Sequence, residues 1–198
     1  GAYHARKAIP QTTLYGYLEI IGQKKCSPEK QEEYIARCIE KVGEIRTLSD
    51  KMFEYALVYE KNEQVEMSEL SFQELVEELE GNQEFLKLKG YQVQKEFQAA
   101  KAAKIMGNRM LFQRMFNNLF SNILKYGEKG HPVLIKIAVD KGRLQIVFLN
   151  QKRQCLRQVE SNQIGLKSVQ KMAELQEGTF FAAEEGEMFA VTMQFPLL

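Results

Sequence analysis

The chain contains no tryptophan, and only three cysteines, two histidines and four prolines occur among its 198 residues. Three scattered cysteines are an odd number and predict no disulfide framework, which fits a reducing compartment. His131 has no cysteine or carboxylate at metal-ligand spacing, so we expect no zinc site there. His4 and His131, the two histidines, also support no Ser-His-Asp arrangement.

Long apolar runs and an excess of one charge are absent as well. No stretch approaches the length of a membrane span, and no signal-peptide pattern opens the chain. The formal net charge of +1 gives no reason to expect nucleic acid or an anionic membrane as a partner. With 44% hydrophobic and 27% charged residues, the composition is that of an ordinary globular protein. We therefore expect a cytoplasmic segment that makes no membrane contact itself.

Apolar residues at helical spacing predict two helices before residue 62. We expect the first over residues 2–23, loosened at Pro10, whose ring removes an N–H and clashes with the preceding turn. The second starts at Ser27, which can cap it, and runs to about Lys61. Its apolar stripe comprises Ile35, Cys38, Val42, Ile45, Met52 and Ala56. Two helices cannot bury so wide a stripe alone, so we expect a four-helix bundle formed by dimerisation.

A polar joint at residues 61–64 separates this hairpin from a mixed α/β pattern. We therefore expect an α+β chain with two domains, residues 1–61 and residues 65–198. The expected strands lie near residues 65–70, 91–97, 131–139, 144–149, 179–183 and 188–195, and the expected helices over residues 71–87, from the cap Asn108 onward and over residues 165–175.

Asn118 and Asn122 lie four residues apart and so share one face of the expected helix, with Lys125 and Tyr126 following within a turn. Amide oxygens of this kind can bind a hydrated Mg²⁺ on an anionic ligand, and the lysine can add a charge to a phosphate. Taken alone, the pattern also fits a helix with two exposed or core-capping amides.

The stretch from Asn118 to Tyr126 resembles the N box of the sensor histidine kinases. That resemblance implies Mg²⁺ and ATP as ligands, with Asn122 holding the metal, Lys125 facing the phosphates and Tyr126 on the adenine side. It also implies that residues 65–198 form the α/β sandwich of the histidine kinase ATPase (Bergerat) type. Chaperone and anti-sigma members of the same superfamily lack a preceding helical hairpin with the Pro-x₅-Gly-Tyr-x-Glu pattern that runs here from Pro10 to Glu19.

A second resemblance covers Gln163 to Val169, which is similar to the last glycine box of that family, Gly-Leu-Gly-Leu-Ser-Ile-Val. It implies that the N–H groups around Gly165, Leu166, Lys167 and Ser168 cradle a phosphate at a helix start. Gln163 replaces the first glycine of that box, and an ordinary loop-to-helix turn would give the same local sequence.

The other glycine box departs further from the family. After the strand over 144–149 the family has Asp-x-Gly-x-Gly, whose aspartate hydrogen-bonds the adenine amino group, whereas this chain has Asn150-Gln151-Lys152-Arg153-Gln154. Asn150 still offers an amide oxygen, but the glycines that allow close backbone approach are gone. The segment from Asn150 to Gly165 is also short for a nucleotide lid. We expect an eroded adenine side and weak or no ATP binding.

The phosphoacceptor motif also differs. The stretch from Pro10 to Glu19 resembles the one that follows the phosphoacceptor histidine, and this alignment puts Ala5 at the histidine position. Arg6 and Ile9 then replace the acidic residue and the Thr or Asn of the family. His4 is an alternative acceptor, but one residue turns a helix by about 100°. We expect no catalytic residue on this chain.

Together these resemblances imply a degenerate sensor histidine kinase-like signalling protein. We expect a homodimer that binds the receiver domain of a response regulator or a partner kinase, and that forms the cytosolic part of a membrane sensor. The alternative is an active ATP-dependent protein histidine kinase of a two-component system. A phosphotransferase would depend on His4.

Overall fold

A computed structural model describes residues 10–59, 65–98, 101–154 and 162–198 of the chain. The chain divides into two compact units, residues 1–63 and residues 64–198, and each is described by itself. The expectations for His4, Ala5, Arg6 and Ile9 lie outside the described residues.

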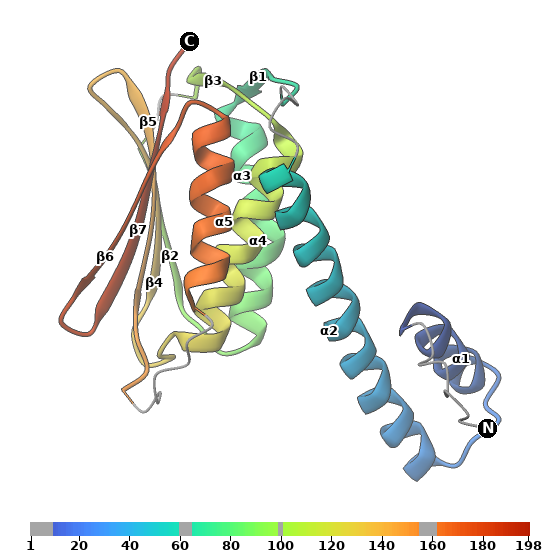
Figure 1. The fold of residues 1–198 in the computed structure, drawn as a ribbon. Helices are drawn as coiled ribbons and strands as arrows, with labels where there is room; N and C mark the ends of the chain where they lie inside the picture. Colours follow the sequence, from blue (N-terminus) through green and yellow to red (C-terminus); the bar gives the residue numbers. More distant parts are fainter. Residues whose placement is uncertain (1–9, 60–64, 99–100, 155–161) are drawn as a thin grey trace. The chain divides into compact units, whose positions relative to one another are not determined.

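The first unit is a helical hairpin of α1 (Pro10–Gly22) and α2 (Pro28–Tyr59) (Figure 1). As predicted, Ser27 caps the second helix: its Oγ accepts a hydrogen bond of 3.3 Å from the Lys30 backbone N–H. Tyr17 and Tyr34 join the two helices, with ring centroids 5.2 Å apart.

Most of the apolar surface of this hairpin is exposed. Among its described residues only Cys38 is buried. Large apolar side chains on α2 that remain exposed include Ile35, Ile39, Val42, Leu48, Met52 and Tyr55. Their spacing of three and four residues within each half of the helix is that of a packing face rather than of scattered surface residues. One copy of the hairpin therefore leaves its apolar face uncovered.

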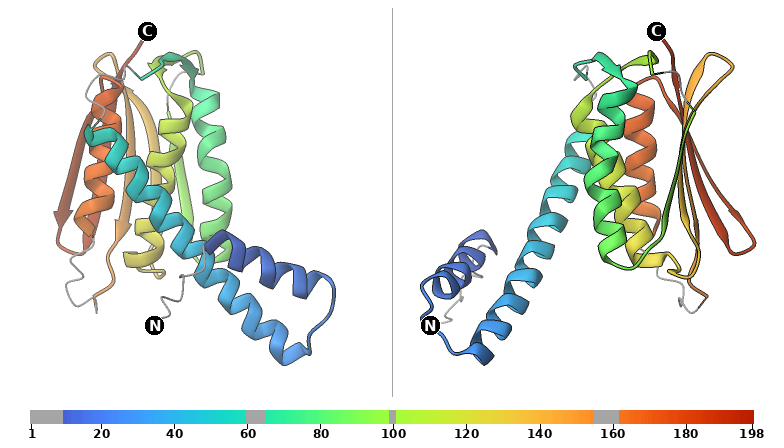
Figure 2. Two further views of the ribbon diagram at one scale, coloured as in Figure 1. Left: turned by 45° about the vertical axis from the view of Figure 1, so that its right-hand side comes forward. Right: turned by 180° about the vertical axis from the view of Figure 1, so that it is seen from behind.

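The second unit is a five-stranded sheet with three helices on one face, as both views show (Figures 1 and 2). The strand order is β2-β4-β5-β7-β6, in which β2 and β4 are parallel and the other neighbours antiparallel. A separate two-stranded sheet pairs β1 with β3. The strands are β1 (Ser68–Ser71), β2 (Val93–Phe97), β3 (Lys104–Gly107), β4 (Val133–Asp140), β5 (Arg143–Gln151), β6 (Thr179–Glu185) and β7 (Met188–Pro196), and the helices are α3 (Phe72–Leu88), α4 (Arg109–Tyr126) and α5 (Asn162–Leu175).

Local sequence explains several of these elements. Lys141 and Gly142 both have positive φ, 49° and 76°. Two positive φ angles are typical of the two-residue hairpin turn whose twist matches that of the flanking strands. This turn joins β4 to β5, as predicted. Ser71 and Glu74 form a reciprocal capping box at the start of α3.

The core lies between the sheet and the three helices. Phe112, Phe116 and Phe120 follow one another at four-residue spacing on α4 and are all buried. Phe120 meets Phe148 of β5 edge to face, with centroids 5.4 Å apart, and Phe112 lies 4.9 Å from Phe195 of β7. These aromatic contacts fix α4 against the middle of the sheet.

Several elements differ from the sequence-based expectations, and three of the differences lie near the sites discussed below. The strand β3 was not expected, because four residues are too few to show a pattern. Residue His131 precedes β4 rather than lying in it. The helix α5 begins at Asn162, three residues before the predicted start at Gly165.

Candidate ligand pocket at the end of α4

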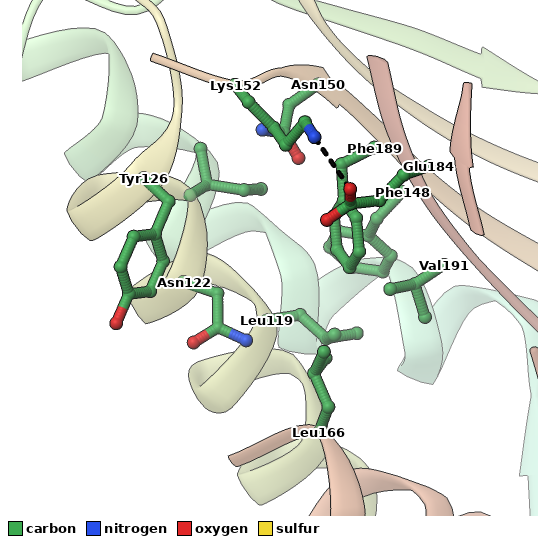
Figure 3. A pocket seen from close by; sticks show the side chains of 11 residues that line it. Leu119, Asn122, Tyr126, Phe148, Asn150, Lys152, Leu166, Glu184, Phe189 and Val191 are labelled. Carbon is green, nitrogen blue, oxygen red and sulfur yellow. Dashed lines mark hydrogen bonds and ion pairs between the residues drawn. The ribbon is translucent and has the colours of Figure 1, made fainter. Parts of the chain in front are cut away.

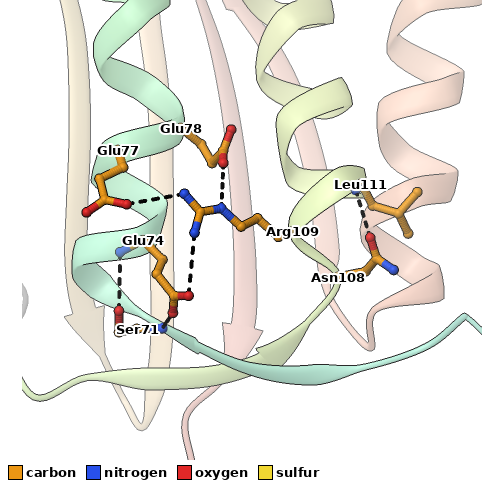
Figure 4. A network of polar contacts seen from close by, with 7 residues as sticks. All are labelled: Ser71, Glu74, Glu77, Glu78, Asn108, Arg109 and Leu111. Atoms are coloured by element: carbon orange, nitrogen blue, oxygen red, sulfur yellow. Dashed lines mark hydrogen bonds and ion pairs between the residues drawn. The ribbon is translucent and has the colours of Figure 1, made fainter.

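The N-terminal end of α4 is tied to its neighbours. Asn108 caps it as predicted, since its Oδ1 accepts from the Leu111 N–H at 3.1 Å. Gln176, which is fully buried, accepts from the Asn108 backbone N–H at 2.7 Å. Arg109 reaches α3, where its Nε donates to Glu78 at 2.6 Å and a second nitrogen donates to Glu77 at 3.2 Å (Figure 4).

The C-terminal end of α4 is held by Arg153. Its Nε donates to the carbonyl of Gly127 at 2.9 Å, a guanidinium nitrogen donates to the carbonyl of Leu124 at 3.2 Å, and its backbone N–H donates to the carbonyl of Tyr126 at 2.9 Å. The Tyr91 hydroxyl lies 3.1 Å from the same Gly127 carbonyl. Carbonyls at a helix C-terminus lack partners within the helix, so these donors stabilise the turn that precedes them.

A pocket opens beside this last turn, between α4, the start of α5 and the ends of β5, β6 and β7 (Figure 3). Its empty space, including the open mouth, is about 490 Å³, but the centre of a water-sized sphere can occupy only about 40 Å³ of it. The apolar lining consists of Leu119, Ile123, Phe148, Leu166, Phe189 and Val191, and the polar lining of Asn122, Tyr126, Asn150, Lys152 and Glu184.

Four of the predicted site residues meet in this pocket: Asn122, Tyr126, Asn150 and Leu166. Gly165 lies against the same place, because a Cβ added to it would come within 3.8 Å of Asn122 Oδ1. The two sequence segments that resemble the N box and the last glycine box are therefore adjacent in space.

Other predicted site residues lie outside the lining. Asn118 is half-buried one turn before Asn122, and Lys125 and Lys167 are exposed. Because α5 starts at Asn162, only its first four residues, ending at Gly165, have N–H groups without a helical partner. The N–H groups of Leu166, Lys167 and Ser168 follow that first turn, so the phosphate cradle expected from them is shorter than predicted.

The sheet end of the pocket carries polar groups that the sequence did not reveal as a set. Asn150 is buried, and its Nδ2 donates to the carbonyl of Gln151 at 3.2 Å. Two residues further along, Lys152 Nζ pairs with Glu184 Oε2 at 2.8 Å. The sequence signal for Lys152 is its place at a family glycine, whereas Glu184 is 32 residues away along the chain and has no local signal.

Asn122 is the residue here that could contribute to a Mg²⁺ site. An amide oxygen is a ligand type that Mg²⁺ accepts when phosphate oxygens supply the negative charge. Among the residues that the structure describes, no three His, Cys, Asp or Glu side chains come together to hold a metal ion by themselves. Within the same ranges, no helix combines the length and hydropathy needed to cross a bilayer.

The two clearest pKa shifts in the second unit lie away from the pocket, at the α3–α4 contact. The backbone N–H of Ser71 donates to the Glu74 carboxylate at 2.8 Å and, with the Ser71 side chain, lowers the pKa of Glu74. A hydrogen bond to Glu78 raises the pKa of Arg109.

Comparison with known proteins links the chain to sensor kinases. No protein-family model matches it. It is 29% identical over 142 residues to the sensor protein CopS of Pseudomonas syringae pv. tomato, and 23% identical over 166 residues to the sensor histidine kinase YrkQ of Bacillus subtilis (strain 168). These matches cover 71% and 83% of this chain but only 28% and 38% of the two relatives. The chain thus spans well under half of either relative.

Solved structures share the fold at low identity. Acinetobacter baumannii histidine kinase AdeS matches with a TM-score of 0.67 and 16% identity, covering 95% of both chains. Full-length ShkA in complex with AMPPNP matches with a TM-score of 0.69 and 15% identity over 96% of this chain and 46% of ShkA. The catalytic domain of histidine kinase ThkA matches 67% of this chain, at 12% identity and a TM-score of 0.55. By sequence and fold together, the chain resembles the sensor histidine kinases.

Proposed function

We propose that this chain is a sensor histidine kinase-like signalling segment that has lost phosphoryl transfer and acts by binding. In this proposal residues 1–61 form the dimerisation domain and residues 65–198 the ATP-binding-type domain. The partners are a second copy of the chain and the receiver domain of a response regulator or another kinase. The segment works in the cytoplasm, as part of a longer sensor.

The observation that carries this proposal is the contrast between the two ends of the pocket. At the α4 end, Asn122 lies beside Gly165 with Tyr126 in the lining, which keeps one candidate metal ligand next to the first turn of α5. At the sheet end, Asn150 offers an amide rather than a carboxylate, and Lys152 projects a long charged side chain where the family has a glycine. A ligand could keep its phosphate contacts while losing its base contacts.

Chemistry at the N-terminus supports the same conclusion. The family alignment puts Ala5 at the phosphoacceptor position, and a methyl side chain has no nucleophilic atom. Mg²⁺ and ATP remain the ligands that the pocket would take, with Asn122 as the metal-binding residue. ATP in complex with Mg²⁺ would supply the phosphoryl group, and without an acceptor on the chain that group has no intramolecular destination.

Dimerisation is supported by the uncovered face of the hairpin. Leu48, Met52 and Tyr55 are 51%, 73% and 64% exposed, although they follow one another at spacings of four and three residues on a helix. Pairing two hairpins into a four-helix bundle would bury these side chains and stabilise both copies.

An active kinase is the second candidate, and the shared pocket of Asn122, Tyr126 and Leu166 favours it. A kinase of this kind would phosphorylate His4 of its own chain or a group on another protein. One assay separates the two candidates: incubation with labelled ATP and Mg²⁺, alone and with a receiver domain, followed by detection of acid-labile phosphate. We expect no label on the chain. Label on His4 that is lost in His4→Ala, or label transferred to an added protein, would establish the active kinase.

A further inference from the structure

We propose that the ion pair between Lys152 and Glu184 acts as a gate at the sheet end of the pocket and sets how tightly a nucleotide binds there. The inference rests on the proposed nucleotide-type ligand and adds what controls its access. Both side chains line the pocket, at the end where the purine base of a nucleotide would have to reach Asn150.

Strand register shows why the pair lies in the path of a base. Asn150 of β5 is directly opposite Phe189 of β7, and Phe189 is directly opposite Glu184 of β6. These three residues therefore form one row across the sheet, and neighbouring strands lie about 4.8 Å apart. Lys152 follows Asn150 by two residues, and its ammonium group meets Glu184 at the far end of the row (Figure 3). The lysine side chain thus spans the row beside Phe189.

The backbone beneath Lys152 is fixed on both sides. Its N–H donates to the Glu187 carbonyl at 2.8 Å, and the Gln151 side chain donates to the Glu187 carboxylate at 2.8 Å. Gln154 donates to the other oxygen of that carboxylate, and Arg153 is bound to the end of α4. Opening the sheet end of the pocket therefore requires the Lys152 side chain to move, rather than the strand that carries it.

The gate has chemical consequences for the ligand. A lysine ammonium can only donate hydrogen bonds, and the amino group of adenine is a donor as well. Lys152 therefore cannot make the hydrogen bond that the family's aspartate accepts from this amino group. A purine that enters must separate Lys152 from Glu184 and leave both charges to water. The side chains are 31% and 62% exposed, so water solvates both and the pair is weak enough to be displaced.

The test compares Mg²⁺-ATP affinity, by calorimetry or by titration of backbone amide resonances, in wild type, Glu184→Gln and Lys152→Gly. Glu184→Gln keeps the shape of the side chain and breaks the ion pair, and Lys152→Gly also frees space. We expect roughly two- to fivefold tighter binding in Glu184→Gln and at least as large a gain in Lys152→Gly. The matched control is Glu185→Gln on the same strand, where the affinity should stay at the wild-type value.

A charge-reversed double variant, Lys152→Glu with Glu184→Lys, should restore the pair and return the affinity to that of wild type. Equal affinities in wild type and both single variants would overturn the gate, and so would no binding in any of them. Asn122→Ala introduced into Glu184→Gln should weaken binding. If it has no effect, the ligand does not occupy this pocket, and the proposed site fails together with the gate.

Discussion

Gln83 lies in the buried stripe of α3 and is 1% exposed, yet neither its Nε2 nor its Oε1 has a hydrogen-bond partner among the described residues. A buried amide without partners loses the hydrogen bonds that it makes to water in the unfolded chain. We predict that Gln83→Leu raises the free energy of unfolding by about 1 kcal/mol. Urea denaturation measures this difference. Gln73→Leu, the same change at an exposed position of α3, is the control and should leave the free energy of unfolding within about 0.5 kcal/mol of the wild-type value. A lower free energy of unfolding in Gln83→Leu would contradict the prediction and show that the amide has a partner.

Glu74 gives a prediction about pH. The Ser71 backbone N–H donates to its carboxylate, so its pKa in the folded chain lies below the ordinary value of 4.5. Its contribution to stability is therefore present well above pH 4.5 and is lost as pH falls through the folded pKa. Glu74→Gln should be less stable than wild type near neutral pH, and the difference should shrink on acidification. Thermal melts of wild type and Glu74→Gln at several pH values from neutral to acidic measure this difference, with Glu80→Gln as an exposed control. A stability difference between Glu74→Gln and wild type that does not vary with pH would contradict the prediction.

At the scale of elements, Arg153 provides the most direct test of how α4 is held. Arg153→Lys keeps the charge but loses the planar fork that donates to the carbonyls of Gly127 and Leu124. We predict faster amide hydrogen exchange in the last turn of α4 and its C-cap, from Asn122 to Gly127, and a loss of about 1–2 kcal/mol in the free energy of unfolding. Exchange measured residue by residue should accelerate more in this last turn than in the N-terminal half of α4, where it reflects only the loss of global stability. Uniform acceleration along α4 would indicate general destabilisation instead.

The elements that sequence alone predicted are those with local signals. Ser27 and Asn108 cap helices through bonds to residues only three positions away, and the Lys141–Gly142 turn requires only its own two positive φ angles. Strand order has no such signal, because β7 lies between β5 and β6 and β2 is parallel to β4. The pocket follows the same rule. Asn122 was predicted from its spacing to Asn118 together with the resemblance of that stretch to the N box, whereas the Lys152–Glu184 pair depends on the register of three strands.

At the scale of the whole molecule, the exposed face of the hairpin predicts a homodimer. Ile39 is 69% exposed between Ile35 and Val42. Sedimentation should show wild type as a dimer at micromolar concentration. Because a carboxylate buried in an apolar contact costs at least about 2 kcal/mol, Ile39→Asp should weaken the dimer roughly 30-fold or more. Gln31→Asp, an exposed polar position on the same helix, is the control, and a monomeric wild type would contradict the proposal.

The central property of this molecule is whether the pocket still holds a nucleotide as a kinase would. Calorimetric titration of the chain with Mg²⁺-ATP is the most direct test, with Asn122→Ala as the site variant. Because each lost contact of about 1.4 kcal/mol weakens binding tenfold, the changed sheet end predicts a Kd of about 1 mM or weaker. A Kd below about 10 μM that Asn122→Ala abolishes would contradict the loss of kinase function and establish an intact ATP site.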